Sequence, residues 1–531
     1  MVTLSINGQA TNAPVGASLF DCAGRIGVRV PTSCLKNGKC KECVVEIAEG
    51  MECLSPPTQY ETHLAGNFRL SCQAIVSASE GHLRCHTMRR GHMRIERRAF
   101  GLPADGQAWQ LDPPVTLPSA GPAYGIAMDL GTTTVVLRLF DLATGEMIAD
   151  SSFENPQRFA GSDIMARIQY DTEHPNKLLR RTLAGYLTHA IEEFPVDPKS
   201  ICEMVVVGNS TMRDLFFRQS VYTIGQSPYR SITELEMAAG KRASTSIVET
   251  GRRCLLPIHP QARVYGAPII SGHVGADAAA CMLATNLAHE DRIVAIMDIG
   301  TNTELIVGNR ERILAASCPA GPAFEGGAIA CGMPALDGAI EDVSIDDRGS
   351  FRFQTIGGVA PQGICGSGLV ALLGELLRTG RMNGRGRFEE DGARIELDVA
   401  NGIYFLESDV NELAQAKGAN VAGLQVVFNQ FGIDFDRVDA FYLAGGFGRH
   451  MNIEAAKRIG LIPPIPDRRI VQIGNAAIEG ATIALLSRAK REELETLVRR
   501  VEHCRLETHP RFFDFFVDGC QFGAVFSEVP R

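Results

Sequence analysis

The feature that most constrains the fold is a strand–turn–strand pattern that occurs twice. The first copy, YGIAMDLGTTTVVLRLFD, spans residues 124–141, and the second, RIVAIMDIGTNTELIVGN, spans residues 292–309. In each copy an apolar strand ends at an aspartate, a glycine–threonine turn follows, and a second strand leads away. From residue 124 onward such strands alternate with helical segments, which indicates an α/β body. The repetition predicts two similar halves, 124–290 and 291–531.

The two turns are typical of phosphate binding. Glycine lets backbone N–H groups approach phosphate oxygens, and threonine hydroxyls add donors. An aspartate at the strand end can hold Mg²⁺, usually through water. A single turn of this kind would fit an ordinary hairpin equally well, but here LAGGFG (443–448) and GNAAIEGATIALL (474–486) follow in order. No Walker A sequence is apparent, so we do not expect a P-loop.

This order of motifs resembles the superfamily of actin, sugar and acetate kinases and heat-shock chaperone ATPases. The resemblance implies a ribonuclease H-like fold in which both turns clamp the phosphates of ATP and the Gly-Gly turn receives the adenosine. It also implies that SGHVGADAAACML (271–283) and the helix after Asn475 connect the two halves. The residues so assigned to the nucleotide are Asp129, Gly131, Thr132, Thr133, Gly300, Thr301, Asn302, Thr303, Gly445 and Gly446.

Three acidic residues are the candidates for catalysis. In the superfamily the acid that opens the first connecting helix positions the attacking water, and Asp277 matches it, although an aspartate there also serves as a helix cap. Asp298 is the candidate for holding Mg²⁺, and Glu304 is a second candidate for catalysis.

A second site is indicated by CLKNGKCKEC (34–43), which has the spacing C-x5-C-x2-C. Together with a remote cysteine it offers four ligands: Cys34, Cys40, Cys43 and Cys72. Plant-type [2Fe–2S] sites have nearly this spacing with a remote fourth cysteine. Structural zinc sites usually show paired CxxC knuckles, of which only one is present here, and an unliganded loop is the third alternative. We expect the neighbouring Cys22, Cys53 and Cys85 to be packing residues.

The surroundings of these cysteines resemble the adrenodoxin branch of the ferredoxin family, which has the longer first gap. The expected order is a hairpin over 2–13, a helix over 18–26, a strand over 43–50, and a strand over 68–76 that carries Cys72. The resemblance implies a β-grasp ferredoxin-like domain over 1–88 that delivers single electrons.

Residues 89–123 predict a linker because they are rich in Pro, Gly and Ala. Its arginine-rich start, MRRGHMRIERRAF (88–100), is either a solvated basic face or a contact for a partner. The net charge of −9 disfavours a nucleic-acid binder. No stretch is long and apolar enough for a membrane helix, and MVTLSINGQA has no secretory character, so we expect a cytoplasmic protein.

Over its whole length the chain resembles the reductive activators of corrinoid proteins, which share VVVGNSTM (205–212), GICGSG (363–368) and the motifs above. The fold class is thus multidomain α+β and α/β: a β-grasp ferredoxin-like domain, a linker, and a duplicated actin-like ATPase body. The resemblance implies ATP-dependent transfer of one electron from a [2Fe–2S] cluster to the Co(II) corrinoid of a methyltransferase-system corrinoid protein, restoring Co(I). It also implies Mg²⁺ and a homodimer, with an unknown upstream electron donor.

Two alternative functions stay open. CPAGPAFEGG (318–327) resembles a helix start in the activators of 2-hydroxyacyl-CoA dehydratases, where the cysteine binds a [4Fe–4S] cluster shared by a dimer. A similar activator of another enzyme is the first alternative, although we expect Cys318 to be structural. The second is a redox sensor that binds nucleotide without turnover.

Overall fold

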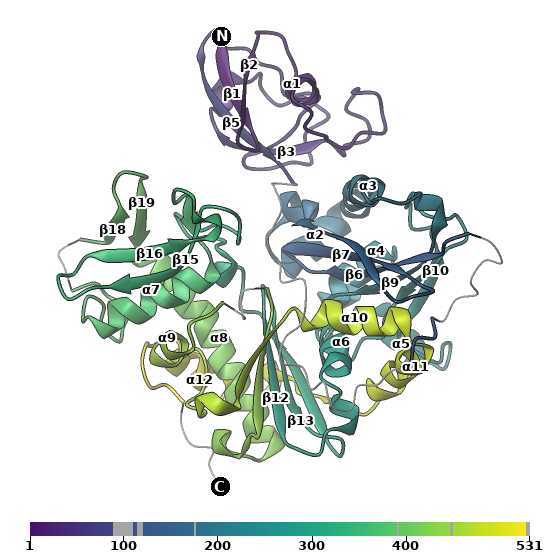
Figure 1. Ribbon diagram of the computed structural model, residues 1–531, viewed down its shortest axis with the longest axis vertical. Helices are drawn as coiled ribbons and strands as arrows, with labels where there is room; N and C mark the ends of the chain where they lie inside the picture. The colour runs from purple at the N-terminus through teal and green to yellow at the C-terminus, as the bar shows by residue number, and fades with distance from the viewer. Residues whose placement is uncertain (89–109, 114–120, 175–176, 390–391, 447–449, 527–531) are drawn as a thin grey trace. The chain divides into compact units, whose positions relative to one another are not determined.

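A computed structural model describes residues 1–88, 110–113, 121–174, 177–389, 392–446 and 450–526 (Figure 1). The described parts of 1–92, 113–206 and 211–266 form one compact unit. The described parts of 93–112, 207–210 and 267–531 form the other. Most of the predicted linker, including its arginine-rich start, lies outside the described residues. The predicted domain boundaries stay predictions.

The N-terminal residues form a five-stranded sheet with strand order β2-β1-β5-β3-β4, on which one helix packs (Figure 1). Asn7 and Gly8, both with positive φ, make the tight turn of the first hairpin, and β1 pairs in parallel with β5. Ser18 caps the helix by accepting a hydrogen bond from the Asp21 N–H at 3.1 Å. The elements are β1 (Val2–Ile6), β2 (Gln9–Ala13), α1 (Leu19–Arg25), β3 (Val44–Glu49), β4 (Phe68–Leu70) and β5 (Gly81–Thr87).

The expected strand over 68–76 is wrong in its extent. Strand β4 ends at Leu70, and Cys72 lies in the turn that follows it. Two backbone bonds within this turn, from Gln73 and Ala74 to the carbonyl of Leu70, curl the chain away from the sheet. A cysteine in such a turn can approach the loop between α1 and β3, which a strand residue could not do without leaving the ladder.

The first half of the body is built on a six-stranded sheet with strand order β10-β11-β9-β6-β7-β8. Three antiparallel strands run in succession along the chain, and β9 and β11 pair in parallel. The elements are β6 (Tyr124–Leu130), β7 (Thr134–Asp141), β8 (Met147–Glu154), α2 (Ile164–Glu173), α3 (Leu178–Glu192), β9 (Ile201–Val207), α4 (Ser210–Phe216), α5 (Ile232–Ala238), β10 (Ile247–Thr250) and β11 (Arg263–Gly266).

The second half repeats this plan in a sheet with strand order β21-β20-β12-β13-β14-β22. Strands β12, β13 and β14 are successive and antiparallel, and β20 and β21 extend the sheet in parallel from β12. The elements are α6 (Ala276–Ala284), β12 (Val294–Ile299), β13 (Thr303–Gly308), β14 (Ile313–Cys318), α8 (Glu407–Phe431), β20 (Ala440–Ala444), α9 (Ile453–Arg458), β21 (Ile470–Gly474), α10 (Ala476–Leu486), α11 (Arg488–Leu497), β22 (Val501–His503) and α12 (Phe512–Gly519).

A subdomain is inserted between β14 and α8. Its described residues form a three-stranded sheet, a two-stranded sheet and one α-helix. These elements are β15 (Ala339–Ile345), β16 (Phe351–Thr355), β17 (Gly363–Ile364), α7 (Gly366–Arg378), β18 (Arg394–Asp398) and β19 (Ile403–Leu406).

The shared plan of the two large sheets confirms the predicted fold class, including the duplication. In both, the hairpin carrying the aspartate is central, because the parallel strands join the edge of its first strand. The turn at the end of that first strand therefore has a rigid base.

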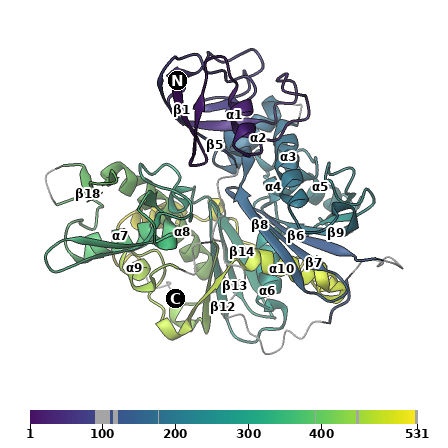
Figure 2. The same ribbon diagram turned by 45° about the horizontal axis from the view of Figure 1, so that its top comes forward.

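Helices α6 and α10, the two predicted connectors, pack directly on each other (Figures 1 and 2). The contact involves backbone: a Cβ added to Gly480 of α10 would lie 2.1 Å from the carbonyl oxygen of Ala280 on α6. Only glycine allows the two helices to approach this closely. No helix in the described parts of the chain has the length and apolar character needed to cross a membrane.

Candidate functional site

The four predicted cluster cysteines form two thiol pairs. The Sγ atoms of Cys43 and Cys72 lie 3.4 Å apart, which joins the loop to the turn after β4. Cys34 and Cys40 are hydrogen-bonded to each other through their side chains. Cys40, Cys43 and Cys72 are buried, and Cys34 is half-buried. The structure thus brings the remote Cys72 to the loop, as predicted.

The loop surrounds these sulfurs with donors. Burial alone would raise the pKa of Cys34, but backbone N–H groups of the loop, among them those of Asn37 and Lys39, outweigh it and lower this pKa. The hydrogen bond from Cys43 is the main reason that the pKa of Cys72 falls to about 6, with Gln73 and the Gly38 backbone adding to the effect. Such donors stabilise thiolates, which are the form of cysteine that binds metal.

The arrangement fits a binuclear cluster better than a single zinc ion. A structural zinc site gathers four ligands around one ion. Among the described residues, no group of three or more His, Cys, Asp or Glu side chains is placed to hold one metal ion. Two separate thiol pairs suit a [2Fe–2S] cluster, in which each iron takes two cysteines. The remaining cysteines of the domain, Cys22, Cys53 and Cys85, are buried in its hydrophobic core.

The first phosphate turn lies between β6 and β7. Its ends are closed by a bond from the Gly131 N–H to the carbonyl of Thr134 at 2.9 Å. Asn155, fully buried, holds the outside of the turn: its N–H donates to the carbonyl of Thr133 at 2.6 Å and its Nδ2 to that of Gly131 at 2.8 Å. Asp129 is the next-to-last residue of β6, directly before the turn. Within the turn, Thr132 is buried. The sequence did not single out Asn155, because its role depends on contact with a turn 24 residues away.

The second phosphate turn, between β12 and β13, is held in a similar way by different residues. The carbonyl of Thr301 accepts a bond from the Gly321 N–H at 2.8 Å, and the Thr301 hydroxyl bonds the carboxylate of Glu325. Thr301 and Thr303 are buried, whereas Gly300 and Asn302 are half-buried. The sequence analysis also did not identify Glu325 as a residue that supports this turn. The one hint in the sequence is that Glu325 is the single acidic residue of a segment otherwise rich in small residues, CPAGPAFEGG.

The three predicted catalytic acids come together. Asp298 on β12 and Glu304 on β13 are directly paired across the hairpin. Asp277 lies in the first turn of α6, and its charge acts on Glu304. Two neighbours fix the acids: Cys281 on α6 donates its S–H to Asp298 at 3.3 Å, and Ser317 on β14 donates to Glu304 at 3.2 Å.

The pKa values of Asp298 and Glu304 show how their surroundings affect the charge of this carboxylate group. Burial raises the pKa of Asp298 to about 6. Burial, followed by the charges of Asp277 and Asp298, raises the pKa of Glu304 well above its usual range. The charges of Asp277 and Asp298 disfavour ionisation of Glu304, and a nearby divalent cation would offset that penalty. Carboxylate oxygens are ligands that Mg²⁺ accepts while it keeps several waters, so these side chains are candidates for holding a hydrated Mg²⁺.

The Gly-Gly turn lies beside Asp298. Strand β20, which it follows, pairs with β12 so that Ala444 is opposite Asp298. Gly445 has a φ of 102°, and a Cβ there would lie 2.4 Å from the carbonyl of Ile299 and 3.0 Å from Oδ1 of Asp298. In the described part of the chain, no atom lies within 4 Å of a Cβ added to Gly446. The Gly-Gly turn thus begins directly beside the second phosphate turn.

Two other segments considered in the sequence have packing roles. Cys318 is fully buried, and a Cβ on Gly423 of α8 would lie 2.0 Å from its Sγ. Burial raises the pKa of the Cys318 thiol, so the thiolate is disfavoured there. Cys365 caps α7, whose first turn, including Ser367 and Gly368, is buried.

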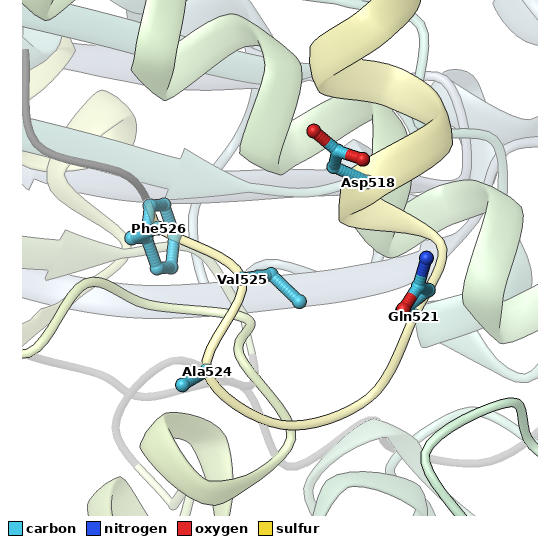
Figure 3. A pocket seen from close by; sticks show the side chains of 5 residues that line it. All are labelled: Asp518, Gln521, Ala524, Val525 and Phe526. Atoms are coloured by element: carbon cyan, nitrogen blue, oxygen red, sulfur yellow. The ribbon is translucent and has the colours of Figure 1, made fainter.

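A cavity of about 300 Å³ lies at the end of α12 (Figure 3). It is lined by Asp518, Gln521, Ala524, Val525 and Phe526. None of the predicted site residues lines it, and its one charged group is an acid, so we assign no nucleotide to it.

Three known families match the chain in succession. They are described as "2Fe-2S iron-sulfur cluster binding domain" over residues 2–77, "RACo middle region" over 124–290, and "C-terminal domain of RACo the ASKHA domain" over 292–528. The matches give the chain a [2Fe–2S] domain and an ASKHA-type ATPase body.

A curated relative decides the family. The "Corrinoid activation enzyme RamQ" of Eubacterium limosum is 32% identical over 432 residues, which cover 76% of this chain and 71% of the relative. The chain belongs to the reductive activators of corrinoid proteins. A second member, the "[Co(II) methylated amine-specific corrinoid protein] reductase" of Methanosarcina barkeri, is 24% identical over 420 residues, 74% of this chain and 76% of that protein.

A solved structure shares the architecture of this activator over nearly the whole chain. The "Reductive activator for corrinoid,iron-sulfur protein" superposes with a TM-score of 0.72 at 27% identity, and 98% of each chain is covered. The resemblance seen in the sequence is confirmed over the full chain.

Proposed function

We propose that this activator uses ATP to drive one electron from its [2Fe–2S] cluster onto the Co(II) corrinoid of a methyltransferase-system corrinoid protein, restoring Co(I). The observation that carries the proposal is the presence, in one chain, of two thiol pairs in a ferredoxin-like domain and three converging carboxyl groups beside an ASKHA-type Gly-Gly turn. Family membership supports both halves of the proposal.

The cluster, when bound, supplies one electron at a time, and Cys34, Cys40, Cys43 and Cys72 are the residues that would hold it. The loop N–H groups around Cys34, and that of Gly38 beside Cys72, would stabilise added negative charge at these ligands.

The body would bind and hydrolyse ATP. The backbone and hydroxyls of the two turns would hold the phosphates, with Asn155 and Glu325 fixing the turns. Asp298 would anchor Mg²⁺ through water, and Asp277 would orient the attacking water from α6. The raised pKa of Glu304 keeps this carboxyl group protonated to a higher pH than usual. Once a cation offsets the charges of its neighbours, Glu304 would lose its proton and could accept one from the attacking water.

ATP is needed because the electron moves uphill. For a one-electron step, each tenfold shift in equilibrium corresponds to about 59 mV, or roughly 1.4 kcal/mol. ATP can supply several such steps by changing how tightly the partner is held in two conformations.

The test is ATP-dependent appearance of the Co(I) absorbance when the reduced activator is mixed with a Co(II) corrinoid protein. We expect little Co(I) without ATP, and none with Asp298→Asn although its cluster is intact. Equal Co(I) formation with and without ATP would refute the proposal. The dehydratase-activator alternative needs a cluster at Cys318, and the full burial of this residue against Gly423 gives it no support. The homodimer stays a prediction, which light scattering would test.

A further inference from the structure

The cluster loop contains an unfavourable backbone conformation that does not help to bury a side chain. Leu35 follows the ligand Cys34, has a left-handed φ of 52°, and is 95% exposed. The left-handed region is sterically unfavourable for a leucine, and an exposed side chain recovers none of this strain by burial. Lys36 and Lys41 are also left-handed. Strain of this kind is usually retained where it serves a function.

Positive charge gathers at the same place. All three lysines of residues 1–88 lie within the loop, at Lys36, Lys39 and Lys41, while the chain as a whole carries a net charge of −9. Lys36 is held by Asp21 at 2.5 Å and lies over the Phe20 ring. Lys39 is exposed and has no ion pair within the described parts of the chain. It is therefore free to meet a charge on a partner.

One side of the loop is already occupied. The carbonyl of Cys40 accepts a bond from Arg181 of α3 at 3.1 Å, and the same guanidinium approaches Glu42 at 3.5 Å. Between the ligands Cys34 and Cys40, the exposed side chains are Leu35, Lys36, Asn37 and Lys39, which place one apolar group and two lysines beside the cluster ligands. We call Leu35, Lys36 and Lys39 the loop tip.

We propose that the loop tip is the docking surface for the upstream electron donor, a small acidic one-electron carrier protein. This proposal rests on the proposed function and identifies the class of protein that would supply the electron to the cluster. Opposite charge steers such a carrier to the loop, and one exposed leucine gives it an apolar contact next to the cluster. The tip is too small for a long-lived complex, and small interfaces are typical of transient redox encounters. A corrinoid partner that must stay bound through an ATP cycle needs a larger surface.

The probe is a bacterial flavodoxin, an acidic carrier whose flavin absorbance can be followed separately from the cluster. Its hydroquinone anion loses one electron to become the neutral semiquinone, and the oxidised cluster gains that electron, so no proton needs to move. Stopped-flow mixing with the full-length, cluster-loaded activator at low and high salt gives the second-order rate constant.

Two variants test the two parts of the surface. Lys39→Glu should lower the rate constant about tenfold at low salt and flatten its salt dependence. Leu35→Asn should lower it several-fold at every salt concentration, although asparagine tolerates left-handed φ and so should not weaken the loop. Lys241→Glu makes the same change of charge at an exposed site after α5 and should leave the rate unchanged. Iron content and visible spectra should be unchanged in all three.

Reduction by methyl viologen radical cation separates docking from damage to the cluster. This small cation gains nothing from lysines, so Lys39→Glu should not slow it; equal slowing with both reductants overturns the proposal. Unchanged flavodoxin rates in both loop variants overturn it as well. If only ATP-dependent Co(I) formation from the pre-reduced variant falls, the tip is the corrinoid dock and the proposal is wrong. A wild-type protein that accepts flavodoxin electrons but forms no Co(I) would refute the proposed function alone.

Discussion

The substitution Gly480→Ala tests whether the close contact of α6 and α10 supports the chemistry. The new Cβ would lie 2.1 Å from the carbonyl oxygen of Ala280 and 2.7 Å from its Cα, so the helices must separate by roughly 1 Å to restore normal contact. Alanine favours a helix over glycine by about 1 kcal/mol, whereas overpacking of this kind costs about 1–3 kcal/mol. The net destabilisation is about 0–2 kcal/mol, which for a unit of this size lowers Tm by at most about 8 °C.

The effect on activity should exceed the effect on stability. Helix α6 carries both Asp277 and Cys281, whose thiol bonds Asp298 at 3.3 Å. A shift of about 1 Å in catalytic groups can reduce the rate about 100-fold. We therefore expect a large loss of ATPase activity, measured by phosphate release, with a small change in Tm and normal cluster absorbance.

The control is the same chemical change in α1, Gly24→Ala, where a Cβ meets no atom within 4 Å. This variant should keep full ATPase activity and an equal or slightly higher Tm. A Gly480→Ala protein with wild-type ATPase activity and Tm would show that the α6–α10 contact is not constrained as the structure indicates.

Other predictions concern the two sites and their surroundings. Cys40→Ser should lose the visible absorbance and iron of the cluster but still bind ATP in calorimetry; full iron content would exclude Cys40 as a ligand. Asp298→Asn should keep the cluster and lose ATPase activity by about 100-fold or more, whereas unchanged turnover would exclude its Mg²⁺ role. Because burial raises the pKa of Asp298 to about 6, this group opposes folding increasingly as pH rises from about 4 through 6; Mg-ATP should therefore raise Tm more at pH 8 than at pH 5, and equal shifts would contradict the site. Burial, then Lys41, lowers the pKa of His63 to about 4, so the unfolded state binds more protons below pH 6.5 and stability falls by about 2 kcal/mol at pH 5. The His63 ring is buried, and neither of its nitrogens has a partner among the described residues, so phenylalanine can take its place. His63→Phe should therefore show a smaller decrease in Tm between pH 7.5 and pH 5 than the wild-type protein does.

Much of the fold was predictable because its signals are local. The strand–turn–strand repeat, the hairpin over 2–13 and the short helix that follows it each depend on a few neighbouring residues, and the structure forms all of them. The cysteine spacing likewise predicted that the chain would bring Cys72 back to the loop, and its Sγ lies 3.4 Å from that of Cys43.

The residues that were missed act over long distances along the chain. Asn155 supports a turn that precedes it by 24 residues, and Glu325 bonds a threonine 24 residues before it. Cys281 is one of several isolated cysteines in the sequence, and only the packing of α6 against β12 places its thiol on Asp298. Such roles depend on the register and packing of distant elements, which no local pattern encodes.

Helix α6 is where the charge of the nucleotide site meets the packing of the body. Asp277, at the N-terminal end of α6, lies close enough to Glu304 for its charge to act on that residue. One turn further along α6, Cys281 donates a hydrogen bond to Asp298, and the backbone of the adjacent Ala280 contacts Gly480. A cation bound near these acids would therefore act on α6, which is packed backbone to backbone against α10. Since a packed contact of this kind favours discrete arrangements over gradual deformation, binding and loss of Mg-ATP would select between arrangements of α6 and α10. An ATPase built in this way can bias how a partner is held, which is what driving a single electron uphill requires.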